Sequence, residues 1–220
     1  MVKIYTHYSD SHKALYEDCF KLTLRELYSK EELPLRVLHH AQTTHDGTFM
    51  TQGWSDSMDY KLNVILSALE ENRNGWFIFA DCDIQFFNPF LKDLENEIQN
   101  HDIVCQEDCG SLCAGFFACK SNIKTQQLFS KIKQTFRMLV NDQVALNEYR
   151  HMVEYKLLDN KKYFTIGNVF TNSRGDHDWD NTTNIIPPKK MLIHHANYVR
   201  GVDNKVKLLK MIRQNYESLV

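Results

Sequence analysis

Residues 76–89 have the sequence WFIFADCDIQFFNP, and this stretch decides the fold. Its first five residues are apolar and bulky, which is typical of a strand buried on both faces of a sheet. Asp81 and Asp83 follow directly. In extended backbone, residues two apart project to the same side, so we expect both carboxylates to face one point at the carboxyl end of the strand. Open α/β sheets bind their ligands at that edge.

The chemistry of this pair suits a hard divalent cation. Carboxylate oxygens at such an edge fit Mg²⁺ or Mn²⁺ carrying a phosphate-bearing ligand. The pattern D-x-D alone has little weight, because 16 aspartates among 220 residues give about one such pattern by chance. Two more are present, Asp176/Asp178 and Asp178/Asp180, which we interpret as a surface loop. Only the first follows an apolar strand, and its alternative interpretation is a pair of solvated turn carboxylates.

Strand and helix patterns alternate along the chain around this segment. β-rich runs predict strands, and apolar residues spaced three to four apart predict helices. The expected strands span residues 2–7, 35–38, 76–80, 103–106 and 114–120. The expected helices span residues 15–27, 56–69, 89–100, 122–139, 141–149 and 203–219. This alternation predicts an α/β fold with a mainly parallel central sheet flanked by helices, in a single domain over residues 1–220.

Charge and hydropathy exclude several classes of protein. The 26 basic and 28 acidic residues give a net charge of −2, which argues against a nucleic-acid-binding protein. The sequence has neither a run of ~18 apolar residues for a membrane span nor a secretory signal. We therefore expect a soluble, cytoplasmic protein without a membrane span. With only 8 glycines, the chain has no glycine-rich loop to bind phosphate.

The six cysteines are expected to be reduced thiols, because the cytoplasm keeps thiols reduced. Five of them raise the alternative of a zinc site: Cys82, Cys105, Cys109, Cys113 and Cys119. Their spacing lacks the C-x2-C pairs typical of zinc ligands. Buried thiols on strands are the favoured interpretation.

Four segments together carry a resemblance to a known family. FIFADCDIQFFNP resembles the D-x-D segment of metal-dependent glycosyltransferases with the A-type fold, a Rossmann-like sheet that binds nucleotide sugars. Residues 102–122 are similar to the family stretch that precedes a smaller second sheet. Residues 141–147, NDQVALN, resemble the "DQ..LN" helix of several retaining members, and residues 194–205 resemble the C-terminal His–Gly–Lys element. Over residues 1–205 the pattern is similar to the nucleotide-diphospho-sugar transferase family, including the transferase domain that large algal viruses use on their capsid protein.

This resemblance implies a metal site. Asp83 would bind Mn²⁺ or Mg²⁺ directly, and Asp81 would bind the ion or the ribose hydroxyls. His195 would supply the C-terminal ligand. His194 projects to the opposite face of a strand, although a shift of one residue in register would exchange the two histidines.

The resemblance also implies a donor site for a nucleotide sugar, expected to be UDP-linked. Residues 1–100 would bind the nucleotide, with Thr6, His7 and Tyr8 at the base and ribose and Lys61 approaching the nucleotide. Residues 101–220 would hold the donor sugar and the acceptor, a glycan or glycoprotein. The residues implied there are Asp142 and Gln143 beside the sugar and Lys205 at the diphosphate. The strand end Gln106-Glu107-Asp108 supplies further catalytic candidates, among which the sequence does not choose.

Two departures and several alternatives remain open. Cys82 stands between the two aspartates, where small or aliphatic residues are commoner, and the element after His195 is longer than H-x-x-G-x-x-K, which affects the role of Lys205. Asp142 could be a helix N-terminal carboxylate, the histidines could be hydrogen-bonded strand residues, and Lys61 and Lys205 could be solvated. A haloacid-dehalogenase-like phosphatase also places D-x-D after a buried strand, but Gln85 stands where that family has Thr or Val. A nucleotidyltransferase would need a glycine-rich loop, whereas a non-catalytic nucleotide-sugar-binding module has the same sequence features.

Overall fold

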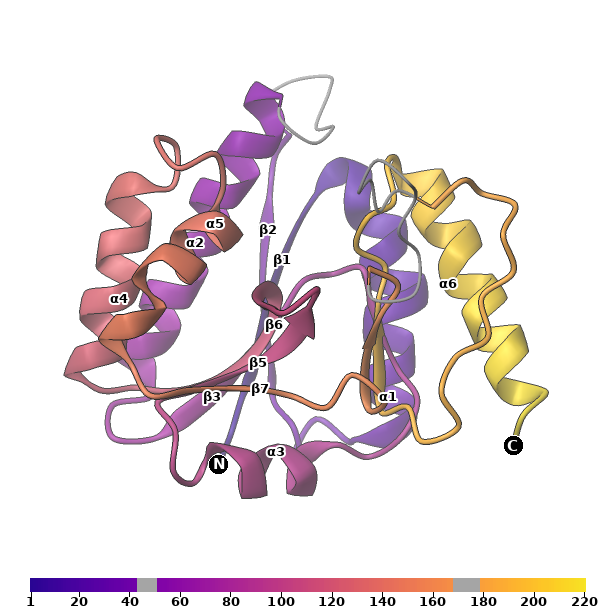
Figure 1. Ribbon diagram of the computed structural model, residues 1–220, viewed down its shortest axis with the longest axis horizontal. Helices are drawn as coiled ribbons and strands as arrows, with labels where there is room; N and C mark the ends of the chain where they lie inside the picture. The colour runs from indigo at the N-terminus through magenta and orange to yellow at the C-terminus, as the bar shows by residue number, and fades with distance from the viewer. Residues whose placement is uncertain (43–50, 168–178) are drawn as a thin grey trace.

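The computed structural model describes residues 1–42, 51–167 and 179–220. A six-stranded sheet lies at its centre, with the strand order β2-β1-β3-β6-β5-β7 (Figure 1). Its strands are β1 (Ile4–Ser9), β2 (Leu35–His40), β3 (Trp76–Ala80), β5 (Ile103–Asp108), β6 (Ser111–Lys120) and β7 (Tyr155–Leu157). The pairs β1–β2, β1–β3 and β5–β7 are parallel, and β6 runs antiparallel to both of its neighbours. The predicted mainly parallel sheet is confirmed.

A smaller second sheet is also present, as the resemblance implied. It has the order β4-β9-β8, with β4 (Ile84–Phe86), β8 (Tyr163–Thr165) and β9 (Ile193–His195). β4 follows the D-x-D segment directly, whereas β9 comes from the far end of the chain. The pairing of β4 with β9 therefore brings the C-terminal histidines next to the aspartates.

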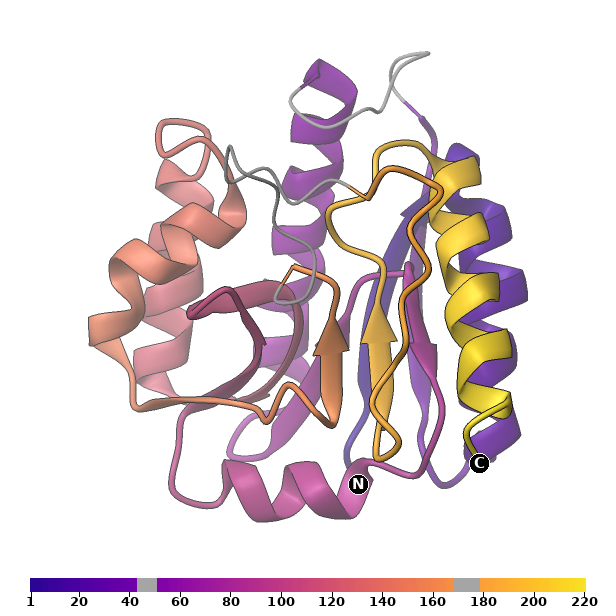
Figure 2. The same ribbon diagram turned by 45° about the vertical axis from the view of Figure 1, so that its right-hand side comes forward.

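The helices form two groups on opposite sides of the fold (Figure 1). One group covers a face of the main sheet, and the other lies beside the second sheet. The first group comprises α2 (Gln52–Glu71), α4 (Ile123–Thr135) and α5 (Asp142–Tyr149), followed by the short η3 (Arg150–Met152). The second group comprises η2 (Leu15–Lys21), α1 (Leu22–Leu27) and α6 (Val202–Glu217), and Figure 2 shows these helices beside the second sheet. The short helices η1 (Asp10–His12) and α3 (Leu91–Ile98) complete the fold.

Strand β3 separates two apolar cores, as its sequence predicts. Phe77 and Phe79 pack into the core beneath α2 and α4, whereas Ile78 and Ala80 pack into the core that includes η2, the second sheet and α6. All four side chains are fully buried. Burial on both faces explains why the strand has no polar residue until it ends at Asp81.

Four expectations about local structure were wrong in detail. Residues 81–83 form a turn rather than extended backbone, because β4 starts at Ile84 and belongs to the other sheet. Residues 15–21 form a π-helical segment before α1 rather than one continuous α-helix. The helix expected from Pro89 starts at Leu91, and the helix expected to reach residue 139 ends at Thr135.

The helices of the described segments are too short or too polar to cross a membrane. Cys82, Cys105, Cys113 and Cys119 are buried as expected, whereas Cys109 is exposed in the turn between β5 and β6.

Candidate active site

Asp81, Asp83 and His195 converge at the carboxyl end of β3. One potential ligand atom from each lies within 4.8 Å of the others. Oδ1 of Asp81 is buried and has no hydrogen-bond partner among the described residues. Two carboxylates and an imidazole are suitable ligands for Mn²⁺ or Mg²⁺, and an unpartnered buried carboxylate oxygen is costly unless a cation or donor meets it. The donor set and the orphaned oxygen thus fit a divalent ion.

Backbone hydrogen bonds hold these three residues in place. The N–H of Asp81 donates to the carbonyl of Gly115 on β6 at 2.7 Å, and the N–H of Ala196 donates to the carbonyl of Asp83 at 3.0 Å. In the second sheet, Ile84 pairs with His195. The turn that carries the aspartates is therefore fixed to both sheets.

The two adjacent histidines differ completely in their surroundings. Nε2 of His195 lies 3.3 Å from Oδ1 of Asp83, and its Nδ1 lies 3.2 Å from Oε1 of Gln106. Because the amide oxygen of Gln106 only accepts, it favours the tautomer with hydrogen on Nδ1. His194 is fully buried beside Phe164, and neither ring nitrogen has a partner among the described residues. The structure brings His195, and not His194, to the aspartates.

The buried charges of Asp81, Asp83 and His195 shift one another's pKa values. Burial opposes the charge of His195, but Asp83 outweighs it and raises the pKa of the imidazole to about 10. Burial likewise opposes the charge of Asp83, yet Lys205 and His195 hold its pKa well below the usual range. The pKa of Asp81 is raised by burial, against the attraction of Lys61. The two aspartates therefore have different proton affinities although they are two residues apart.

Lys205 reaches this group from the first turns of α6. Its ammonium pairs with Oδ2 of Asp83. Burial disfavours its charge, but Asp83 outweighs burial and raises the pKa of the lysine. Lys205 is thus part of the cluster despite the longer spacing after His195, and its interpretation as a solvated lysine is wrong.

Lys61 is a second buried cation, on α2. Its Nζ lies 3.1 Å from Oδ2 of Asp81 and 2.9 Å from Oδ2 of Asp142. Burial lowers its proton affinity, but Asp142 and Asp81 outweigh burial and raise its pKa. Asp142 is at the start of α5, whose N-cap is Asn141 as predicted. Lys61 joins the D-x-D to the helix expected beside the donor sugar, so its interpretation as a surface residue is also wrong.

Gln143 and Asp108 form a neighbouring group. Nε2 of Gln143 donates to Oδ2 of Asp108 at 2.8 Å, and its Oε1 accepts from the N–H of Ala114 at 3.1 Å. Four residues along the same helix, the amide of Asn147 bonds both the N–H and the carbonyl of Leu112. These bonds attach α5 to the ends of β5 and β6, and both ends of the Gln143 amide are used within the protein.

The residues expected at the nucleotide lie at the end of β1. Thr6 is fully buried, and its hydroxyl has no partner among the described residues. Tyr8 stacks between Tyr16 and His39, with ring centroids 4.3 and 4.9 Å apart. His7 stacks on the ring of His40 and contacts its Nε2 at 3.4 Å. Burial, followed by the charge of Lys61, lowers the pKa of His7, so its ring is neutral near neutral pH.

Sequence reasoning missed Gly115 and Asn197, and it placed Gln106 among the candidates at the donor sugar rather than beside His195. A Cβ on Gly115 would lie 2.2 Å from Cε1 of His195 and 2.9 Å from Oδ2 of Asp81, so only glycine fits there. Gln106 orients His195 through the contact between its Oε1 and Nδ1 of the histidine at 3.2 Å. Both amide atoms of Asn197 are buried without a partner among the described residues. All three lie in segments that resemble the family, Gln106 and Gly115 in residues 102–122 and Asn197 in residues 194–205.

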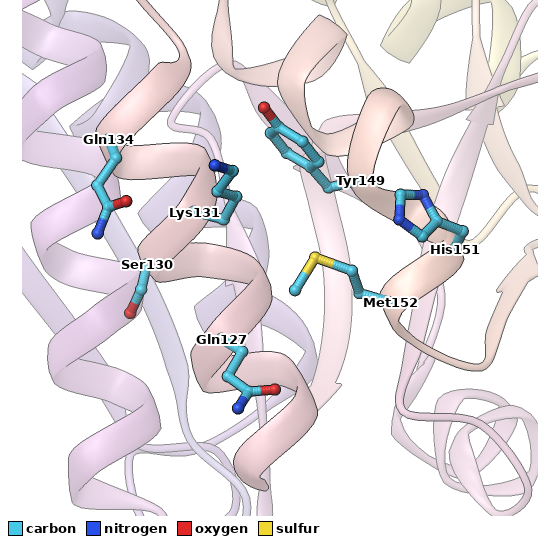
Figure 3. Close-up of a pocket in the computed structure, with 7 residues that line it drawn as sticks. All are labelled: Gln127, Ser130, Lys131, Gln134, Tyr149, His151 and Met152. Atoms are coloured by element: carbon cyan, nitrogen blue, oxygen red, sulfur yellow. The ribbon is translucent and has the colours of Figure 1, made fainter.

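Two other features stand apart from the site. Asp176 and Asp178, of the later D-x-D patterns, lie outside the described residues. A surface hollow of about 490 Å³ lies between α4 and the α5–η3 segment (Figure 3). Its lining residues are Gln127, Ser130, Lys131, Gln134, Tyr149, His151 and Met152. None of these belongs to the carboxylate cluster.

A mainly parallel sheet, a second small sheet and an acidic pair at their junction are the features of the A-type glycosyltransferase fold. The chain belongs to the nucleotide-diphospho-sugar transferase family, whose model matches residues 14–209. The UDP-galactose:fucoside alpha-3-galactosyltransferase of Dictyostelium discoideum is 26% identical over 165 residues, which are 61% of this chain and 25% of that protein. This match therefore covers only a quarter of the relative's length.

Solved structures agree with this assignment of the fold. A glycosyltransferase involved in glycosylation of the major capsid of PBCV-1 superposes with a TM-score of 0.66 and 12% identity, over 96% of this chain and 98% of that chain. The galactosyltransferase LgtC, in complex with donor and acceptor sugar analogs, gives a TM-score of 0.57 and 11% identity over 100% of both chains. GlyE of Streptococcus pneumoniae gives 0.59 and 14%, over 100% of this chain and 63% of that chain.

Proposed function

We propose that this chain is a metal-dependent glycosyltransferase that moves a sugar from a UDP-sugar to a glycan or glycoprotein acceptor. The observation that carries the proposal is the convergence of Asp81, Asp83 and His195 within 4.8 Å at the carboxyl end of β3. A nucleoside diphosphate leaves with developing negative charge, and a divalent ion held by these residues stabilises that charge as a Lewis acid.

The chain's own residues complete the anion site. The ammonium group of Lys205, at Asp83, is placed to donate to the diphosphate and adds a fixed positive charge. Gln106 keeps the imidazole of His195 oriented by accepting from its Nδ1. We propose that the nucleobase and ribose lie beside Thr6, His7 and Tyr8 at the end of β1, where the Tyr8 ring is held between Tyr16 and His39.

On the sugar side, we propose that Asp142, Gln143 and Asp108 surround the donor, and that transfer retains the anomeric configuration. Retention is supported by the resemblance of NDQVALN to the helix of retaining members. Lys61 holds the Asp142 carboxylate in place at 2.9 Å, and we propose that this carboxylate stabilises a positively charged sugar centre.

UDP-galactose is the first donor to test. The Dictyostelium relative is named for UDP-galactose and a fucoside, and LgtC is named a galactosyltransferase. A haloacid-dehalogenase-like phosphatase is ruled out by the family match. A non-catalytic binding module is distinguished by turnover alone, so release of UDP in the presence of fucosides and other glycans is the assay that separates it from a transferase.

The decisive experiment is calorimetry of UDP and GDP, and of their sugars, with and without Mn²⁺. We expect UDP to bind only with the metal, and Asp83→Asn to abolish that binding. Asp59→Asn is the matched control, because Asp59 pairs with Lys133 at 2.8 Å outside the site. Metal-independent binding, or binding unchanged by Asp83→Asn, contradicts the proposal.

A further inference from the structure

Tyr198 follows the metal-side histidine by three residues and reaches the sugar side. Its hydroxyl donates to Oδ2 of Asp108 at 2.9 Å. The backbone of Tyr198 has φ of 55°, a left-handed conformation that favours glycine over residues with a side chain. Backbone strain of this kind occurs at functional sites, so it directs attention to the role of the Tyr198 side chain.

The surroundings hold this side chain in one position. A Cβ on Gly167 would lie 2.6 Å from Cε2 of the Tyr198 ring and 2.9 Å from Oδ1 of Asp108, so the absence of a side chain there makes room for both groups. The carbonyl of Tyr198 accepts from the N–H of Trp179 at 2.9 Å. Burial, followed by the charge of Asp108, raises the pKa of the phenol, so the hydroxyl stays protonated and donates.

Asp108 is the group on which these contacts converge. Its side chain is buried, and Oδ2 accepts from both Tyr198 and Gln143. Oδ1 is buried without a partner among the described residues. In this buried carboxylate one oxygen accepts two hydrogen bonds and the other accepts none. The carboxylate therefore has a fixed orientation and can accept one more hydrogen bond. A sugar hydroxyl is a donor of fitting chemistry.

We propose that Tyr198 is a positioning residue for the donor sugar: its hydroxyl fixes the carboxylate of Asp108 that accepts from a sugar hydroxyl, without contributing to nucleotide binding. This inference rests on the proposed function. Tyr198 also links the metal side of the site to the sugar side, because His195 and Tyr198 belong to one short segment.

The test compares Tyr198→Phe with the wild type by the ratio of UDP-galactose affinity to UDP affinity in Mn²⁺, measured by calorimetry. Tyr198→Phe keeps the aromatic ring and removes the hydroxyl that donates to Asp108. Because the Asp108 carboxylate is then held by Gln143 alone and loses its fixed orientation, we expect the ratio to fall roughly tenfold while UDP affinity is unchanged. Tyr163→Phe is the matched control, since its hydroxyl donates to Asp93 at 2.9 Å away from the site. It should leave the ratio unchanged.

A double-mutant cycle shows whether Tyr198 acts through Asp108. In the Asp108→Ala background, which removes both carboxylate oxygens, Tyr198→Phe should have little further effect on the ratio. A ratio that stays within twofold of the wild type in Tyr198→Phe, or effects of the two substitutions that simply add, overturns the inference. Failure of the wild type to bind UDP with Mn²⁺ would instead overturn the proposed function, so the two failures are distinguishable.

Discussion

Nζ of Lys61 lies 2.9 Å from Oδ2 of Asp142, and both side chains are buried. The same ammonium lies 3.1 Å from Asp81, so one cation neutralises carboxylates from the D-x-D turn and from α5. This contact joins the two parts of the site electrostatically as well as sterically.

Lys61→Met should destabilise the fold strongly. It leaves two carboxylates without their buried counter-ion, and breaking a buried ion pair in this way costs about 3–5 kcal/mol. Urea denaturation measures the free energy of unfolding. Lys133→Met is the control, because its partly exposed pair with Asp59 should contribute no more than about 1 kcal/mol. Equal losses in the two variants would show that Lys61 is not an essential counter-ion.

Asp142→Asn should damage sugar transfer more than nucleotide binding. The amide can still accept from Lys61, so the fold should persist, but the negative charge proposed beside the sugar is lost. We expect turnover to fall roughly 100-fold with little change in UDP affinity. Steady-state kinetics and calorimetry measure the two effects. If UDP binding weakens as much as turnover, Asp142 does not lie at the sugar.

Gly115→Ala should disturb the metal ligands without unfolding the chain. The added methyl group would lie 2.2 Å from the ring of His195 and 2.9 Å from Asp81, so both must move. Misplacing metal ligands typically reduces metal affinity by about 10- to 100-fold, and titration with Mn²⁺ and UDP would show this. At Gly75 a Cβ meets only the carbonyl oxygen of Asn72, at 3.3 Å. Gly75→Ala should therefore bind normally, and equal binding by both variants would argue against a site at His195.

His194→Leu should reduce the loss of stability in acid. Burial lowers the pKa of His194 to about 3, whereas in the unfolded chain it is about 6.5. Between these values the unfolded state binds a proton that the folded state does not, so His194 lowers the free energy of unfolding as pH falls, by up to about 1.4 kcal/mol per unit. Leucine removes this dependence. Denaturation at pH 7 and pH 5 should show a smaller difference for the variant, and an equal or larger one contradicts the assignment.

The sequence by itself determined the class of fold and the location of the acidic pair. Strand β3 must be buried on both faces because residues 76–80 contain no polar side chain, and alternating strands and helices then require a mainly parallel sheet. The start of α5 was predictable because Asn is a preferred N-cap residue. In the structure the side chain of Asn141 accepts from the N–H of Val144, as a cap does.

Only the tertiary structure decided which residues meet. The D-x-D lies in a turn rather than in extended backbone, and its carboxylates converge because β4 and β9 pair with Ile84 opposite His195. That register separates His194 from His195, and no local pattern sets it, because both side chains are buried. The sequence left open whether Lys61 and Lys205 lie in the site or in solvent, because it shows helix faces but not which carboxylates those faces meet. Long-range pairing, set by the packing of both sheets, supplied the charge network and the contact between Tyr198 and Asp108.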